Sequence, residues 1–193
     1  MNSLSNITST EFRTALTPER VRIGMFIQAF LAGGALIFFL AVLLVGMINQ
    51  PNALYAIDLE LLTTMTFACA LFFLLTFIIG HFLYNMQFKS ERLESAYSSD
   101  LKDKNGNIIS ASPAEKAVSL IRTSMLIRTA LLEGSAFFGL AVLLVGAQQG
   151  AIISYSWIWI NALPLLVLII WVIVTFPTSS RLEKIFETKI IKS

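Results

Sequence analysis

Two charged side chains stand inside a long apolar run, and they are the residues of this chain best suited to chemistry. Glu133 lies in the stretch ALLEGSAFFG, and Arg128 precedes it by five residues. A carboxylate inside a membrane is costly, and it usually faces the interior of a helix bundle or a watery cavity. Glu133 and Arg128 are therefore the candidate residues of a proton or cation site. The alternatives are a structural carboxyl that hydrogen-bonds to a neighbouring helix and an arginine that reaches back to the lipid headgroups.

The two residues do not pair with each other along one helix. A separation of five residues corresponds to about 140° around a helix axis, whereas intrahelical partners stand three or four residues apart. Any partner of Glu133 is therefore expected on another helix.

Other sources of catalytic or metal chemistry are nearly missing from the sequence. The chain has one histidine, His81, and one cysteine, Cys69. A lone cysteine allows no intramolecular disulfide and no cysteine-based metal site. The sequence contains no nucleophile–base pair and no glycine-rich phosphate loop. We therefore expect no enzyme activity, no metal and no cofactor. The formal net charge of +2 is too small to suggest nucleic-acid binding.

The elements that carry these residues are predicted to be membrane-spanning helices. Hydrophobic residues make up 56% of the 193 positions and charged residues only 13%, against about 25% charged in a typical soluble domain. A spanning helix needs about 20 mainly apolar residues. Four segments of this kind are visible, at roughly Ile23–Ile48, Leu61–Tyr84, Met125–Ala147 and Trp157–Phe176. Ser112, Pro113 and Glu115 form a helix-start pattern, with Ser as the cap, Pro in the first turn and Glu at the third position. The third helix is therefore expected to begin near Pro113, ahead of its apolar segment.

The basic residues predict the orientation of these spans. Of the 14 lysines and arginines, 13 lie before the first span, between the second and third, or after the fourth. Cytoplasmic loops carry such an excess, so both termini and the middle loop are predicted to be cytoplasmic. The expected segments are a polar N-terminal segment (1–22), a first transmembrane hairpin (23–88), a cytoplasmic loop (89–116), a second hairpin (117–178) and a cytoplasmic amphipathic tail (179–193). The apolar face of that tail suits a helix lying on the inner leaflet.

The chain contains a tandem repeat. The segment from Arg22 to Gly46 matches the segment from Arg122 to Gly146 at 13 of 25 positions, including LAVLLVG in both. A weaker echo, Arg-Leu-Glu, begins at Arg92 and again at Arg181. These matches predict a duplicated two-helix hairpin, whose copies run in the same direction through the membrane. Gln28 and Gly33 of the first copy stand where Arg128 and Glu133 stand in the second, so only the second copy carries the charges.

The surroundings of Glu133 resemble a known family. The stretch ALLEGSAFFGLAVLLVG resembles the carboxylate helix of rotary ATPase c subunits over 17 of 193 residues. The resemblance implies ion handling at Glu133. The second span lacks the repeated glycines of that family, its short polar loop is replaced here by more than twenty residues, and two flanking helices are extra.

Small residues at a spacing of four predict close packing between helices. The spacings let helix backbones approach each other, and we expect them to join the first and third spans. The residues concerned are Ala29, Gly33, Gly34, Ala130, Gly134 and Gly139. In the fourth span, Asn161 and Pro164 are expected to mark a kink.

The sequence thus predicts an all-α integral membrane protein of four transmembrane helices, formed by two tandem hairpins. Two functions are compatible with it. The first is a non-catalytic assembly or interaction subunit of a larger membrane complex or homo-oligomer. The second is an oligomeric channel or proton- or cation-linked transporter that uses Glu133. The expected partners are membrane lipid and further copies or other membrane subunits. The expected location is the bacterial inner membrane.

Overall fold

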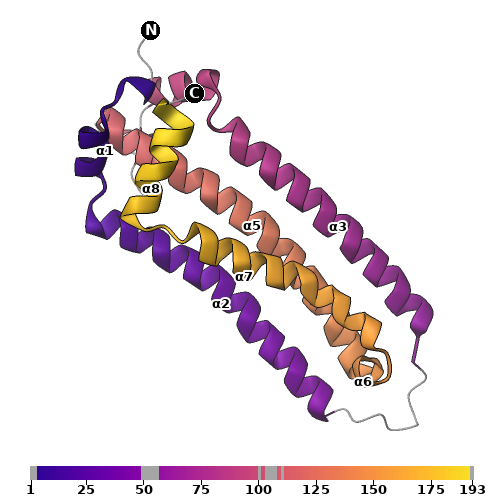
Figure 1. Ribbon diagram of the computed structural model, residues 1–193. Coiled ribbons are helices and arrows are strands. Elements are labelled where there is room, and N and C mark those ends of the chain that lie inside the picture. The colour runs from indigo at the N-terminus through magenta and orange to yellow at the C-terminus, as the bar shows by residue number, and fades with distance from the viewer. Residues whose placement is uncertain (1–3, 49–56, 100, 103–107, 110, 192–193) are drawn as a thin grey trace. The chain divides into compact units, whose positions relative to one another are not determined.

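Four helices of the protein are long and apolar enough to cross a membrane (Figure 1). The computed structural model describes residues 4–48, 57–99, 101–102, 108–109 and 111–191. The first three spans are α2 (Pro18–Ile48), α3 (Leu59–Met86) and α5 (Pro113–Gln148). The fourth consists of a 3-10 helix, η2 (Ser156–Ala162), continued by α7 (Leu163–Thr175). The prediction of four helices long and apolar enough to cross a membrane is confirmed.

Short elements make up the rest of the described chain. Two strands of two residues each pair antiparallel, with Leu101 opposite Ile109, and apart from this pair the regular elements of the described residues are helical. The short elements are η1 (Leu4–Asn6), α1 (Ser9–Ala15), α4 (Ser90–Ser98), β1 (Leu101–Lys102), β2 (Ile108–Ile109), α6 (Ala151–Ser154), α8 (Ser179–Phe186) and the π-helix η3 (Glu187–Ile191).

Helix starts follow local capping chemistry. The backbone N–H of Ser112 donates to the Glu115 carboxylate over 2.9 Å, and the N–H of Glu115 donates to the Ser112 hydroxyl over 3.3 Å. This reciprocal cap starts α5 at Pro113, as the sequence predicts. A second capping box joins Thr8 and Glu11 at the start of α1. Helix α8 is capped by Thr178, whose hydroxyl accepts from the N–H of Arg181.

The chain folds into two compact units, each of which combines separate stretches of the sequence. The bundle unit contains residues Ala29–Gly80 and Thr129–Val174, and the terminal unit contains Met1–Gln28, His81–Arg128 and Thr175–Ser193. Helices α2, α3 and α5 contribute to both. The terminal unit thus includes the N-terminal segment, most of the middle loop and the tail.

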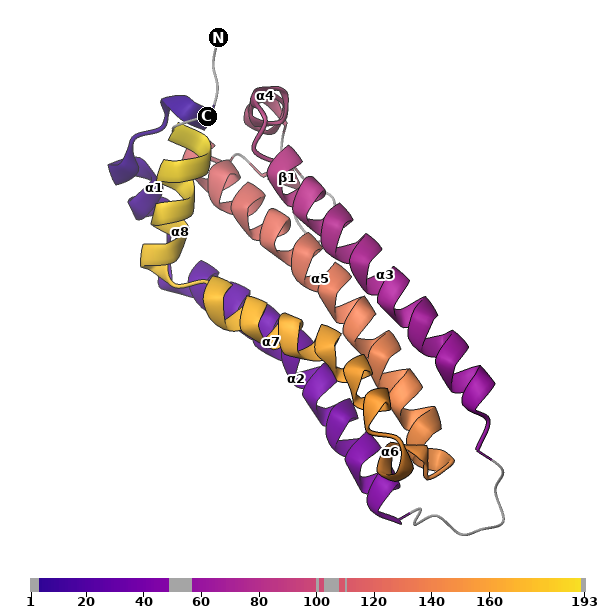
Figure 2. The same cartoon turned by 45° about the vertical axis from the view of Figure 1, so that its right-hand side comes forward.

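In the bundle unit, α5 is the central helix. It runs between α2 and α3 in both views (Figures 1 and 2). In an apolar stretch of 18 residues, 50% of the α5 residues are buried. The corresponding share is 22% in α2, 17% in α3 and 33% in the fourth span. Aromatic contacts join it to its neighbours: Phe38 of α2 lies 5.7 Å from Phe137, and Phe72 of α3 lies 5.7 Å from Phe138, measured between ring centroids. Helix α5 therefore positions Glu133 relative to the other spans.

The repeated helices bury equivalent positions. Seven positions of α2 are buried, and the residues 100 positions later in α5 are buried at every one of them except Arg128. The same side of both helices therefore faces protein. The buried positions of α2 are Val21, Gly24, Gln28, Ala32, Ala35, Val42 and Gly46.

The terminal unit has its own hydrophobic core, in which the two ends of the chain meet. Phe12 of α1 stacks on Phe186 of α8 with ring centroids 4.0 Å apart and planes within 5°. Leu4, Phe186 and Ile190 are each 0% exposed. The apolar face of the tail therefore packs against α1 and η1, and it is not free to lie on the inner leaflet as the sequence suggests.

Candidate functional site

Glu133 lies on an outward-facing part of α5. Ala130, Glu133, Gly134 and Phe137 follow the spacing of one helix face. Ala130 and Gly134 are exposed, Glu133 is half-buried, and Phe137 is partly exposed at the edge of this face, where its ring meets Phe38 of α2. Among the residues that the structure describes, Glu133 makes no hydrogen bond and no ion pair. The carboxyl that the sequence places within the apolar part of a span thus lies on a surface of the folded chain, without a partner among the described residues.

Arg128 has different surroundings, in the terminal unit. Its guanidinium carbon lies 5.7 Å from the centroid of the Tyr84 ring, at the end of α3. A guanidinium over an aromatic face is attracted by the negative charge of the ring face. Arg128 therefore contributes to packing between α5 and α3, and the paired ion site with Glu133 stays a prediction without a contact that supports it.

The small residues that the sequence marks for packing fall into two groups. A Cβ atom added to Gly33 or to Gly134 would meet no atom within 4 Å, and Ala29 and Ala130 are exposed. A Cβ on Gly34 would make only an ordinary contact of 3.9 Å with Phe137. Within the described chain, Gly33 and Gly134 are thus not points at which the first and third spans meet. The reason is that Gly33 lies on the side of α2, and Gly134 on the side of α5, that faces away from the neighbouring helices.

Gly139 is the small residue of this set that lies at a close approach. A Cβ atom there would collide with the backbone carbonyl oxygen of Asn161. Asn161 is 2% exposed, and its side-chain nitrogen donates to the Thr66 hydroxyl and to the carbonyl oxygen of Ile158, each over 2.9 Å. The polar contact ties α3 to the fourth span, and the missing side chain of Gly139 allows α5 to join them.

The sequence gives only part of this arrangement. Asn161 was expected to mark a kink, and a 3-10 helix of seven residues, η2, ends one residue beyond it. Runs of 3-10 helix longer than three or four residues are uncommon. Its bond to Thr66 has no local sequence signature, because the two residues are 95 positions apart. A polar amide in an apolar run was the available signal, since such a group needs an internal partner in lipid.

The terminal unit contains a cavity of about 510 Å³. Its wall includes Arg20 and Glu115, which form an ion pair, together with Tyr97 and Thr14. Arg20 also donates to the carbonyl oxygen of Ala15 over 3.0 Å. Arg20 and Glu115 therefore bind each other, and the carboxylate of Glu11, the third charged residue of the wall, accepts from the N–H and hydroxyl of Thr8.

The remaining candidates for chemistry are dispersed. His81 lies within hydrogen-bond distance of the Asn85 amide, at 2.9 Å, and Asn85 also accepts from Lys189 over 3.0 Å. Cys69 is buried. In the described part of the chain, no group of three or more His, Cys, Asp and Glu residues is arranged to hold a metal ion. Comparison with known protein families, curated proteins and solved structures finds no match to this chain.

Proposed function

We propose that the protein is a non-catalytic assembly subunit of a membrane complex, and that the outward face of α5 binds a transmembrane helix of another subunit. The face consists of Ala130, Glu133, Gly134 and Phe137 and is called the α5 face below. The observation that carries the proposal is the carboxyl of Glu133, which lies on this face without a partner among the described residues. A carboxyl at membrane depth normally faces protein or water, and a second helix on this face would supply the protein.

The residues beside Glu133 favour a helix as the covering group. Ala130 and Gly134 are small and exposed, and nothing in the described chain lies within 4 Å of a Cβ on Gly134. Association of helices in lipid depends on close packing and on interhelical hydrogen bonds. The α5 face offers both, because a backbone can approach at Gly134 while a donor on the partner reaches Glu133.

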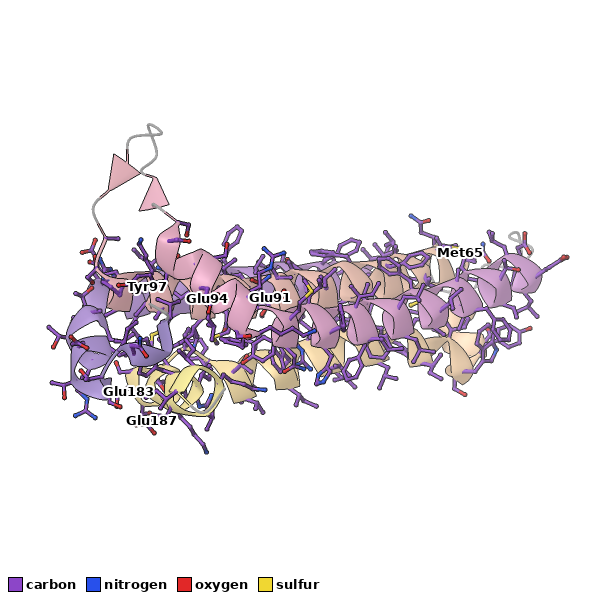
Figure 3. All side chains as sticks on the ribbon, turned by 90° about the horizontal axis from the view of Figure 1, so that it is seen from above. Met65, Glu91, Glu94, Tyr97, Glu183 and Glu187 are labelled. Carbon is purple, nitrogen blue, oxygen red and sulfur yellow. The ribbon has the colours of Figure 1, made fainter. Side chains whose placement is uncertain are left out.

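The topology in this proposal has both termini and the 89–116 loop in the cytoplasm, in the inner membrane of a bacterium. Two duplicated hairpins form the bundle. Support for the duplication comes from the shared buried positions of α2 and α5 and from the short helices α4 and α8, which follow α3 and α7. The equivalent leucines of these short helices, Leu93 and Leu182, are each 1% exposed. In Figure 3, Glu94 and Glu183 mark the corresponding places on the two helices.

Orientation is tested by labelling single cysteines with a membrane-impermeant reagent in a Cys69→Ser background. Glu60 and Ser98 are both exposed, one at the start of α3 and one at the end of α4. We expect labelling of Glu60→Cys in intact cells and labelling of Ser98→Cys only after the membrane is opened. The reverse pattern contradicts the topology.

The assembly role is tested by the native mass of the protein extracted in mild detergent, with identification of every chain in the particle. We expect more than one chain per particle, either as copies of this chain or as another membrane subunit. A particle with a single chain under conditions that keep the fold intact contradicts the proposal.

A second function, an oligomeric channel or proton- or cation-linked transporter, is favoured by the same carboxyl. A carboxyl with no ion-pair partner among the described residues is able to exchange a proton or cation when copies assemble around it. The two functions differ in whether the charge of Glu133 has to change, and the variants of Glu133 in the Discussion separate them.

A further inference from the structure

Two buried polar atoms in the terminal unit have no hydrogen-bond partner among the described residues. They are the side-chain oxygen of Gln28, on α2, and the Nε of Arg122, on α5. Gln28 as a whole is only 1% exposed. A buried polar group without a hydrogen bond is costly, so two such atoms in one unit suggest a bound ligand.

Arg122 lies against the face of α2 that carries Gln28. A Cβ atom built on Gly24 would lie 3.8 Å from the Nε of Arg122 and 3.5 Å from the Cγ of Pro177. Gln28 stands one helical turn after Gly24 on the same face of α2. Side chains on a helix lean towards its N-terminus, so Gln28 is on the side of α2 that Arg122 approaches at Gly24. The site therefore lies where α2, α5 and the segment before α8 meet.

The charge of the site favours an anion. Arg122 forms no ion pair with any described residue. Arg20 is close enough for its charge to act on Arg122, and its own partner is Glu115. Guanidinium groups bind phosphate oxygens well because their N–H donors form a planar fork. In the topology proposed above, the site lies at the cytoplasmic end of the spans, where the basic residues gather, and lipid phosphates are within reach there.

The hydrogen-bonding needs of the two atoms narrow the ligand further. The Nε–H of Arg122 is a donor and requires an acceptor, and the Gln28 oxygen is an acceptor and requires a donor. A phosphate ester that also carries a hydroxyl supplies both. We propose that Arg122 and Gln28 bind a glycerophosphate group, with a phosphate oxygen at Arg122 and a glycerol hydroxyl at Gln28. Two sources share this chemistry, the headgroup of phosphatidylglycerol and free glycerol 3-phosphate.

The repeat provides a matched control for Arg122. Arg22 is the equivalent arginine of the first copy, 100 positions earlier, and it is exposed. General attraction between basic residues and acidic lipids acts on both arginines. Binding at a specific site depends on Arg122 and not on Arg22, because the buried Nε without a partner belongs to Arg122.

The test is native mass spectrometry of the full protein in detergent, titrated with phosphatidylglycerol or with phosphatidylcholine. Arg122→Lys keeps the charge and removes the Nε donor, and Arg22→Lys is its control. We expect wild type to retain phosphatidylglycerol in preference to phosphatidylcholine, Arg122→Lys to lower that preference several-fold, and Arg22→Lys to leave it unchanged. Equal preference in all three proteins, or an equal loss in both variants, overturns the site.

A second variant keeps the test decisive if Arg122→Lys disturbs the fold. Gln28→Glu has nearly the same shape and gives Arg122 an internal carboxylate, so it should keep the helical content and expel the phosphate. Retention of phosphatidylglycerol at the wild-type level by Gln28→Glu means that bridging water fills the site, and it refutes the proposal. Competition by millimolar glycerol 3-phosphate identifies the free ester as the ligand, whereas retention of lipid in its presence identifies the headgroup.

Discussion

Gly139 of α5 lies so close to the backbone carbonyl oxygen of Asn161 that no side-chain atom fits between them. The contact joins the central helix of the bundle unit to the 3-10 helix of the fourth span, η2. Asn161 holds its own position through the bonds of its side-chain nitrogen to Thr66 and Ile158. The close approach therefore depends on two features together, the absence of a side chain on one helix and a satisfied amide on the other.

Gly139→Ala is expected to destabilise the fold. The added methyl group forces the Asn161 backbone away from α5, and overpacking of this kind costs about 1–3 kcal/mol. Gly134→Ala is the control, because a Cβ at that position meets nothing within 4 Å. Thermal unfolding in detergent should give a lower Tm for Gly139→Ala and an unchanged Tm for Gly134→Ala. Equal stability of the two variants contradicts the contact.

Removal of the Asn161 amide is expected to weaken the same region. Asn161→Ala takes the donor from the Thr66 hydroxyl, and an interhelical hydrogen bond in a membrane protein contributes on average about 0.6 kcal/mol. The losses of stability from Asn161→Ala and Thr66→Val should be less than additive, because both changes break the bond between these two side chains. A double-mutant cycle measured by unfolding in detergent checks this expectation. Additive losses would mean that the hydrogen bond does not contribute to stability.

The ion pair between the two ends of the chain predicts a dependence on pH. Arg13 donates to the two carboxylate oxygens of Glu183 over 3.0 and 2.9 Å, and these hydrogen bonds hold the pKa of Glu183 below its ordinary value of 4.5. A carboxyl whose pKa is lower in the folded state stabilises the fold above its ordinary pKa, and this contribution is lost as the pH falls through the folded value. The packing of α1 on α8 should therefore weaken below about pH 4.5.

Hydrogen exchange of the α1 amides, corrected for the intrinsic rate, measures this effect. In wild type, protection of the α1 amides should fall as the pH is lowered. In Glu183→Gln, protection should already be reduced at pH 7, and it should fall less than in wild type when the pH is lowered. Glu94→Gln is the control, since Glu94 occupies the equivalent place on α4 without an ion pair among the described residues. An identical acid response in wild type and Glu183→Gln excludes this carboxyl as the cause.

The sequence predicts the four spans well, because only helices satisfy the backbone within lipid and an apolar run of that length has few alternatives. The start of α5 is also predicted, since Ser112 and Glu115 form a cap from residues three positions apart. Signals of this kind are local in the chain. They require no knowledge of which helix lies beside which.

The core of the terminal unit has no such local signal. Phe12 and Phe186 stack on each other although they lie near opposite ends of the chain, and the apolar residues of the N-terminal segment are spread among serines and threonines. The sequence does not reveal the orientation of Gly33 and Gly134 for another reason. In lipid, both the protein side and the outer side of a helix are apolar, so spacing alone does not reveal which side a small residue occupies.

Gly134→Leu is expected to prevent assembly while leaving the chain folded. The position is open within the described chain, so a leucine fits there until a second helix approaches. Ala68→Leu is the control, because Ala68 is exposed on α3 outside the α5 face. Native mass in detergent should show a several-fold loss of the assembled particle for Gly134→Leu only. Intact assembly of that variant places the interface elsewhere.

Substitution of Glu133 separates the two proposed functions. Glu133→Gln keeps the size of the side chain and most of its hydrogen bonds and removes only its titration. If Glu133 joins helices, Gln is nearly silent, and Glu133→Leu weakens assembly because a donor on the partner helix loses its acceptor. If Glu133 carries protons or cations, both variants abolish flux while the particle stays assembled.

The measurement is flux of protons or cations into liposomes that contain the protein and any chains that purify with it, combined with the native mass of each variant. We expect wild-type assembly for Glu133→Gln and loss of assembly for Glu133→Leu. Intact assembly of both variants together with loss of a wild-type flux overturns the assembly role and establishes the titrating site.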